Sequence, residues 1–416
     1  MKKYKKLRGM SDSLPSEVRN YESIESIFKK NSSCFGYQEV RFPLIEETEL
    51  FSRTVGEDSD IVNKEMFTFS SKSGKSMTLR PEGTAGCMRM AIENGLLDEG
   101  SQRLMYLGPM FRYERPQKGR TRQFNQMSLE AYGISDFSID IEMIQISNKI
   151  FKDLNISNSV TLEINSIGNL EDQKKYAEQL RKYFSKYEKD LDENNKARLS
   201  RNPLRILDSK DKKIKEIVFG APEIKNVISK SSMENFEKIT SLLGSIGINF
   251  KINQNLVRGL DYYNDLVFEW KSSKIGSQET ICGGGRYDFL SKILGGREVP
   301  AIGLSFGLER LSLCVNSSVT EAFKKLQIIV LDKAFFLNGI KLAEELRQSL
   351  DNYSIQFLGN DTNLKNALRK ASKKKLDYMV IIGREEIDKK VYTLKNLKKE
   401  KEYKSLNKEK LITLLN

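Results

Sequence analysis

Hydrophobic and polar residues alternate in short runs between residues 35 and 135, with turn signals between the runs. The stretch KEMFTFSSKSGKSMTLRPE, residues 64–82, is typical, because two alternating segments flank SKSG, a sequence that favours a hairpin turn. Alternation with period two puts one face of each strand on a core and leaves the other polar. The pattern therefore predicts an antiparallel sheet in this part of the chain.

The spacing becomes helical between residues 170 and 245. The segment QKKYAEQLRKYFSKYEKDLDENNKARL is highly charged and poor in β-branched residues, and most of its charges are explained by a solvated helical face. Strand alternation returns in LVFEWKS, where Leu266, Phe268 and Trp270 share one face, and continues through CGGGRYD and AIGLSFGLERLSL. We therefore expect a helical insertion within one sheet-containing core.

Strands and helices alternate after Leu326. LQIIVL, SIQFLG, YMVIIG and VYTLKNL read as strands, with helices near residues 337–350 and 362–374, which indicates a small α/β domain with a largely parallel sheet. The predicted fold class is α+β: an antiparallel-sheet core with a helical insertion, plus a C-terminal α/β domain. The predicted segments are the first part of the core, the insertion, the second part of the core and the C-terminal domain: 1–169, 170–245, 246–322 and 323–416.

One predicted hairpin concentrates charged side chains: FRYERPQKGRTRQFNQMSLE, residues 111–130. We expect strands at residues 110–114 and 123–131, joined by the loop RPQKGRTR. Alternation then directs Met127 and Leu129 toward a core and polar residues toward the other face. Four polar residues would then share one face of the hairpin: Arg112, Glu114, Gln126 and Glu130. Since any half-exposed sheet also shows polar alternation, the hairpin alone leaves both interpretations open.

The composition limits the kinds of partner, metal site and compartment that the protein can have. The formal net charge of +13 indicates an anionic partner without choosing between nucleic acid and a membrane surface, and 21 basic against 13 acidic side chains in residues 321–416 give that segment a net charge of +8. The four cysteines form no C-x-x-C pair, so a cytoplasmic protein without a structural metal is expected. The basic N-terminus lacks the apolar run of a signal peptide, and no window is long enough for a membrane span.

The chain contains no histidine. Any mechanism that needs an imidazole base, imidazole metal ligand or imidazole pH switch is therefore excluded. Chemistry in this protein must depend on carboxylates, arginine, lysine, tyrosine or the backbone.

Four further motifs are weak when each is taken alone. RPEGTAG, residues 80–86, reads as a strand-to-helix turn, LVRGLDYY, residues 256–263, gathers polar side chains before a strand, and ICGGGRYD, residues 281–288, would let a ligand lie against backbone. FGLERL places Arg310 at the start of a helix, where a single arginine is most often a surface residue. None of these matches a P-loop or the dinucleotide-binding G-x-G-x-x-G.

Taken in this order, the motifs resemble a class II aminoacyl-tRNA synthetase, specifically the histidyl-tRNA synthetase family. FGYQEVRFPLIEE, with Pro43, is similar to the first motif of the class, FRYERPQKGRTRQFNQ to the second and GLSFGLERL to the third. LVRGLDYY and GGGRYD resemble segments peculiar to the histidine family and are the more specific evidence. The resemblance covers the whole chain and implies ATP-dependent attachment of L-histidine to its tRNA through a histidyl-adenylate.

The resemblance also implies roles for individual residues. Arg112 and Arg258 would contact the α-phosphate of ATP and Arg310 the γ-phosphate, with Glu114 in the ATP site and Mg²⁺ on the outer phosphates. The histidine α-amino group would meet Glu82, Thr84 and Gln126, next to Gly83. Glu130 and Tyr263 would contact the two imidazole nitrogens, and two further tyrosines would wall the pocket: Tyr262 and Tyr287.

The implied partners are histidine tRNA and a second copy of the chain. A loop would face the tRNA acceptor end with four residues, Arg115, Gln117, Lys118 and Arg120, while the C-terminal domain would bind the anticodon. The first motif implies a homodimer, and no membrane partner is expected. The alternative is a regulatory paralogue that serves as a subunit of ATP phosphoribosyltransferase in histidine biosynthesis. Such paralogues usually lack the C-terminal domain and the catalytic arginines, whereas this chain has both.

Overall fold

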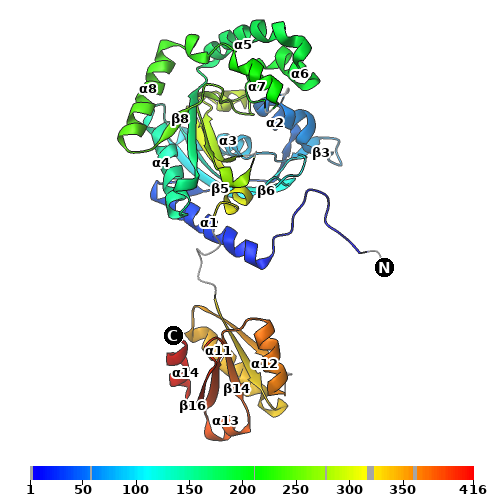
Figure 1. The fold of residues 1–416 in the computed structure, drawn as a ribbon, viewed down its shortest axis with the longest axis vertical. Coiled ribbons are helices and arrows are strands. Elements are labelled where there is room, and N and C mark those ends of the chain that lie inside the picture. The colour runs from blue at the N-terminus through cyan, green and yellow to red at the C-terminus, as the bar shows by residue number, and fades with distance from the viewer. Residues whose placement is uncertain (1–2, 57–58, 210, 277–278, 316–322, 359–362) are drawn as a thin grey trace. The chain divides into compact units, whose positions relative to one another are not determined.

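The computed structural model describes residues 3–56, 59–209, 211–276, 279–315, 323–358 and 363–416. The chain forms two compact units, Met1–Thr320 and Glu321–Asn416, each with its own sheet (Figure 1). The predicted domain boundary at residue 322 and the predicted helix start at residue 362 lie outside the described residues. No described helix combines the length and the apolar character that crossing a bilayer requires.

The first unit is built on an eight-stranded sheet with the order β1-β5-β6-β11-β10-β9-β7-β8. The strands have the following bounds: β1 Gln38–Glu39, β5 Gln102–Phe111, β6 Gln123–Tyr132, β7 Thr161–Ser166, β8 Phe250–Ile252, β9 Asn264–Lys271, β10 Thr280–Arg286 and β11 Ala301–Gly307. A separate three-stranded sheet, β2-β4-β3, contains the predicted hairpin around SKSG, and its strands are β2 Ile45–Glu47, β3 Phe67–Ser70 and β4 Ser76–Leu79.

The expectation of a purely antiparallel core sheet is wrong. The central pairs are antiparallel, but β1 pairs with β5 and β7 with β8 in parallel. Parallel neighbours need a long crossover connection. The helical insertion is that crossover for β7 and β8, and the small sheet with its helices separates β1 from β5. The α+β class itself is confirmed.

Helices cover both faces of the central sheet (Figure 1). Outside the insertion they are α1 Pro15–Cys34, α2 Thr48–Val55, α3 Thr84–Glu93, α4 Ser138–Asp153, α9 Leu290–Ile293 and α10 Leu308–Ser312, with a π-helical turn at Ile61–Glu65. Between residues 170 and 245 the chain forms α5 Leu170–Phe184, α6 Glu193–Arg201, α7 Lys212–Phe219 and α8 Lys230–Ser245, and a 3-10 turn, Pro203–Ile206, follows α6.

Each face of the central sheet has its own hydrophobic cluster. Met127 and Leu129 of β6 lie in the cluster that includes buried residues of α1 and α4, whereas Tyr132 lies in the opposite cluster with residues of α3 and the insertion. On β9, Phe268 joins the first cluster and its neighbour Val267 the second. Period-two alternation thus assigned the faces of both strands correctly. The face of the sheet that carries Tyr132 also carries most of the polar side chains of β6.

The predicted strand at residues 110–114 is also wrong, because β5 starts at Gln102 and ends at Phe111. The Arg112 amide still donates to the Arg122 carbonyl at 2.9 Å, but the next amide, Tyr113, donates to Glu65 at 2.6 Å. The ladder between β5 and β6 is therefore lost after one more bond. Consequently Arg112 and Glu114 lie on irregular chain that leaves the sheet.

The second unit is a five-stranded sheet with the order β13-β12-β14-β15-β16. β12 pairs in parallel with β13 and β14, which confirms the predicted parallel part, while β15 and β16 add an antiparallel edge. The elements are β12 Lys324–Val330, α11 Phe336–Ser349, β13 Tyr353–Leu358, α12 Leu364–Lys373, β14 Tyr378–Ile382, α13 Arg384–Lys389, β15 Tyr392–Asn396, β16 Lys401–Leu406 and α14 Lys408–Leu415.

Candidate active site

A buried carboxylate, Glu130, lies on the polar face of β6 near the end of the strand and is 1 % exposed. It accepts hydrogen bonds from the Thr84 hydroxyl at 2.9 Å, from the Tyr106 hydroxyl at 2.8 Å and from the Tyr287 hydroxyl. Burial raises the pKa of Glu130 to about 8, although these hydroxyls lower it. Because burial disfavours its charge, a ligand that donates a hydrogen bond or carries positive charge would favour the ionised form of Glu130.

Two glycines make room for this carboxylate. Gly303 of β11 lies opposite Glu130 in the sheet, and a Cβ there would be 1.8 Å from a Glu130 carboxylate oxygen. A Cβ at Gly83 would lie 2.3 Å from the Tyr106 ring. Side chains at these positions would displace Glu130 or its tyrosine partner.

Three tyrosines pack around this carboxylate. The ring centres of Tyr262 and Tyr263 are 4.7 Å apart, and Tyr287 lies 5.4 Å from the first and 6.2 Å from the second. All three are buried. They form an apolar wall whose hydroxyl groups supply specific polar contacts, the usual make-up of a small-molecule site.

Glu82 lies beside this tyrosine wall, at the start of α3. Its carboxylate accepts the backbone amides of Thr84 at 2.7 Å and Ala85 at 2.9 Å, and the Tyr262 hydroxyl lies 3.5 Å away. Burial raises the pKa of Glu82, while the amide hydrogen bonds and the charge of Arg112 oppose that rise. The helix N-terminus therefore holds a second buried carboxylate close to the first.

Arginines gather on the irregular chain beyond β5. The Arg112 Nε donates to the Pro81 carbonyl at 2.8 Å, and its guanidinium lies 5.4 Å from the Phe124 ring centre. The Glu114 carboxylate lies 3.8 Å from Arg112 and 3.0 Å from Arg120. One carboxylate is thus shared by two guanidinium groups, which leaves an excess of positive charge.

Arg310 of α10 adds a further cation beside this group. It donates to the carbonyls of Thr280 at 2.8 Å and Gly119 at 3.3 Å, and among the described residues no carboxylate forms an ion pair with it. Burial and the nearby charges of Arg120 and Arg112 lower the pKa of Arg310 to about 10. An arginine held by carbonyls and repelled by other arginines favours an anionic ligand.

Arg258 is held from two sides. Its guanidinium pairs with Glu269 of β9 and lies 5.8 Å from the Tyr263 ring centre. Burial works against its charge, but Glu269 outweighs this effect and the pKa of Arg258 is raised. A Cβ at Gly283 would lie 2.5 Å from Arg258 Nη1, so that glycine of the GGG motif makes room for a side chain of the protein.

The remaining predicted residues lie around these groups. Gln126 is half-buried on β6, opposite Gly108 and Gly307, so its neighbours across the sheet have no side chains. The loop at residues 115–122 turns at Gly119, whose φ is +71°, and its exposed side chains are Arg115, Gln117 and Lys118. Arg120 is half-buried because it contacts Glu114.

Sequence reasoning missed Tyr106, Glu269 and Thr280. Thr280 connects the surroundings of two arginines. Its hydroxyl donates at 2.8 Å to Glu269, the partner of Arg258, and its carbonyl accepts from Arg310. A signal was present for the other two. Tyr106 lies opposite Ser128 on the polar face of β5, and Glu269 is a carboxylate between two buried residues of β9, Phe268 and Trp270.

Buried carboxylates beside a central sheet, arginines gathered around them and a separate α/β unit are the arrangement expected of an aminoacyl-tRNA synthetase of the class II type. Residues 9–311 match the family model for histidyl-tRNA synthetase, and residues 325–416 match the anticodon binding domain. The chain belongs to the histidyl-tRNA synthetase family.

Individual relatives match over the whole length. A histidine–tRNA ligase of Francisella philomiragia is 43% identical over 419 residues, covering 100% of this chain and 99% of the relative. A histidine–tRNA ligase of Buchnera aphidicola is 44% identical, covering 97% and 95%. The structure of apo S. aureus histidyl-tRNA synthetase has a TM-score of 0.81 and 28% identity, with 99% of each chain covered.

Proposed function

We propose that this site activates L-histidine with ATP and that the protein then transfers the histidyl group to its tRNA. The chain is a histidine–tRNA ligase by membership of its family and by its full-length similarity to enzymes of that name. The regulatory paralogue is not favoured, because the anticodon-binding unit and all three arginines are present.

The observation that carries the proposal is a continuous set of contacts from a carboxylate to an arginine. Glu130 contacts the Tyr287 hydroxyl, the Tyr287 ring contacts Tyr262 and Tyr263, and the Tyr263 ring faces Arg258. A ligand bound along this row would have a polar, hydrogen-bonding group at the carboxylate and an anionic group at the cation. Histidine joined to a phosphate has that distribution.

In the activation step the histidine carboxylate attacks the α-phosphate of ATP, and pyrophosphate leaves. Negative charge accumulates on the phosphoryl oxygens, so fixed cations are the main catalytic need and no imidazole base is required. We assign Arg112 and Arg258 to the α-phosphate and Arg310 to the γ-phosphate. A chain without histidine can therefore catalyse this reaction.

Recognition of the amino acid follows from the complementary pairing of imidazole, which donates from one nitrogen and accepts at the other. We assign Glu130 and Tyr263 to the two nitrogens, with Tyr262 and Tyr287 as walls. The α-amino group is assigned to a second set at the start of α3 and on β6: Glu82, Gly83, Thr84 and Gln126. An amino acid lacking the imidazole would leave buried polar groups unpaired, which gives strong selectivity without editing.

Mg²⁺ would accompany the outer phosphates of ATP, and such sites usually combine one or two carboxylates with phosphate oxygens. Glu114, between Arg112 and Arg120, is a carboxylate of that kind. Bound Mg²⁺ would neutralise part of the phosphate charge.

The tRNA acceptor end is assigned to the exposed cations Arg115 and Lys118 with Gln117, next to Arg120, and the anticodon to the second unit. Residues 35–47 are assigned to a homodimer interface, and the compartment to the cytoplasm.

The experiment that tests this function is ATP–pyrophosphate exchange by the purified full chain with each of the twenty amino acids and without tRNA. We expect exchange that depends on histidine alone. A folded protein that supports no exchange would refute the synthetase function and favour the regulatory subunit. Exchange with a different amino acid would overturn the assignment of Glu130 and Tyr263.

A further inference from the structure

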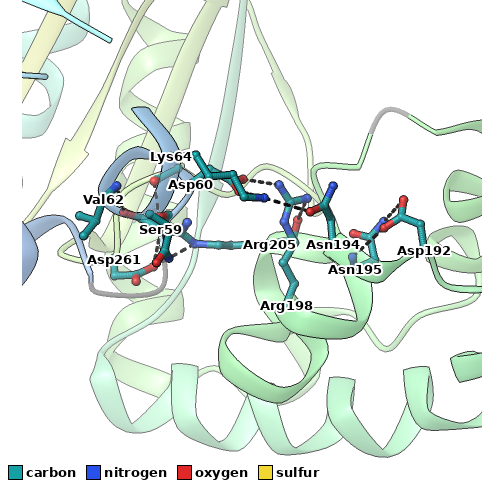
Figure 2. Close-up of polar contacts among 12 residues, drawn as sticks. Ser59, Asp60, Val62, Lys64, Asp192, Asn194, Asn195, Arg198, Arg205 and Asp261 are labelled. Atoms are coloured by element: carbon teal, nitrogen blue, oxygen red, sulfur yellow. Dashed lines mark hydrogen bonds and ion pairs between the residues drawn. The ribbon is translucent and has the colours of Figure 1, made fainter. Parts of the chain in front are cut away.

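The helical insertion contacts the rest of the first unit through a row of polar side chains (Figure 2). Arg198 of α6 donates to Asp60 at 2.7 Å, and Lys64 donates to Asn194 of α6 at 3.0 Å. Further along the row, Arg205 of the 3-10 turn reaches Asp261 (Figure 2). The insertion is therefore fixed to two separate segments of the core.

The contact at Asp261 is the more elaborate of the two. Arg205 donates to one Asp261 carboxylate oxygen from Nε at 3.1 Å and from Nη2 at 2.7 Å, and Nη2 also donates to the Gly259 carbonyl at 3.1 Å. The side-chain amide of Asn202 donates a further hydrogen bond of 2.9 Å from Nδ2 to the same oxygen. Arg205 is only 9 % exposed, so these charge-assisted bonds are shielded from water.

The segment that Arg205 holds has no regular structure of its own. Residues 256–263 lie outside any helix or strand, so individual contacts hold their backbone, among them a bond of 3.0 Å from the Gln173 side chain of α5 to the Tyr263 carbonyl. On the core side, the Asp261 amide donates to the Val55 carbonyl at 3.3 Å. A Cβ at Gly56 would lie 1.9 Å from an Asp261 carboxylate oxygen, so the core fits closely around this aspartate. Asp261 is thus held between the core and the insertion.

The held residues separate two groups that act on opposite parts of the proposed ligand. Arg258 precedes Gly259 and Asp261 in the chain, and Tyr262 and Tyr263 follow them directly. A shift of this segment would move the tyrosine wall relative to Glu130. Displacements of this kind can cost up to about 100-fold in activity even when the mutated residue contacts no substrate.

We propose that Arg205 is a positioning residue for histidine binding: through Asp261 and Gly259, the insertion holds Tyr262 and Tyr263 in the geometry that accepts the amino acid. This inference rests on the proposed function, because it takes the tyrosine wall as part of the histidine pocket. The insertion is then a structural part of the amino-acid site as well as a neighbour of it.

The test measures histidine-dependent ATP–pyrophosphate exchange for wild type, Arg205→Gln and Arg205→Lys. We expect Arg205→Gln to raise the KM for histidine about 10-fold while the KM for ATP changes little. Lysine can pair with Asp261 but cannot reproduce the fork that also reaches Gly259, so Arg205→Lys should give an intermediate KM. A purely structural role would lower the active fraction, and hence kcat, without changing the KM for histidine.

The matched control is Arg198→Gln, which breaks another arginine–aspartate contact between the same insertion and the core. Its KM for histidine should stay within about twofold of wild type. Asp261→Asn and the double variant Arg205→Gln/Asp261→Asn complete a cycle, in which the double variant should be no worse than the more impaired single variant.

The outcomes separate the two proposals. If wild type shows no histidine-dependent exchange, the proposed function fails. If wild type is active and Arg205→Gln keeps a wild-type KM for histidine, the positioning role is overturned while the function stands. An equal rise in KM for Arg198→Gln would also overturn it, because general docking of the insertion would then explain the effect.

Discussion

Replacing Arg258 with methionine is expected to lower kcat for histidine-dependent ATP–pyrophosphate exchange by about 100-fold to 1000-fold. Glu269 and the space at Gly283 fix this guanidinium beside the tyrosine wall, where it is assigned to the α-phosphate. Methionine keeps much of the side-chain volume but removes the charge that stabilises the transition state. The KM for histidine should change much less, since the cation acts mainly on the developing phosphoryl charge.

Two further variants sharpen this prediction. Arg258→Lys restores a charge without the planar fork and should recover only part of the activity. Arg103→Met is the matched control, because Arg103 pairs with Glu142 through two bonds of 3.0 and 3.1 Å outside the site. If the control loses as much activity as Arg258→Met, the loss reflects a broken ion pair and gives no support for a catalytic role.

Replacing Glu130 with glutamine is expected to raise the KM for histidine about 100-fold with little change in the KM for ATP. Three hydroxyl groups donate to this carboxylate, and an amide in its place offers one acceptor oxygen and an NH₂ group that is itself a donor. The imidazole would lose its acceptor for the same reason. Glu142→Gln serves as the control, and an unchanged KM in Glu130→Gln would remove Glu130 from the histidine pocket.

The same variant has a second readout in the pH dependence of stability. Glu130 has a pKa raised from 4.5 to about 8 by burial, so between these values the folded protein retains a proton that the unfolded chain has released. Its contribution to the free energy of unfolding therefore falls as pH rises, by up to about 1.4 kcal/mol per pH unit. The free energy of unfolding should therefore fall more steeply for wild type than for Glu130→Gln between pH 5 and pH 8. Equal slopes for the two proteins would contradict the raised pKa of Glu130.

The sequence predicted the fold where local patterns decide it. Alternation assigned Met127 and Glu130 to opposite faces of β6, and turn residues located the hairpin at SKSG. It failed where distant partners decide. The end of β5 depends on a bond from Tyr113 to Glu65, and the parallel pairing of β8 depends on where the insertion returns the chain. Neither partner is visible in a local window.

The candidate site shows the same division. Motif resemblance pointed to Arg112, Arg258 and Arg310, and the structure places each beside other candidate residues. Glu269 was missed because its importance comes from an ion pair with Arg258, which lies outside the strands. Arg205 was missed because it lies in a segment whose charges are mostly solvated, and only its contact with Asp261 distinguishes it.

The most direct test of the proposed active site is a crystal structure of the full chain with histidine and a non-hydrolysable ATP analogue. We expect the imidazole ring between Glu130 and Tyr263, and the phosphates in contact with three arginines: Arg112, Arg258 and Arg310. Histidine bound away from Glu130, or phosphates that leave these arginines without contacts, would contradict the proposed site.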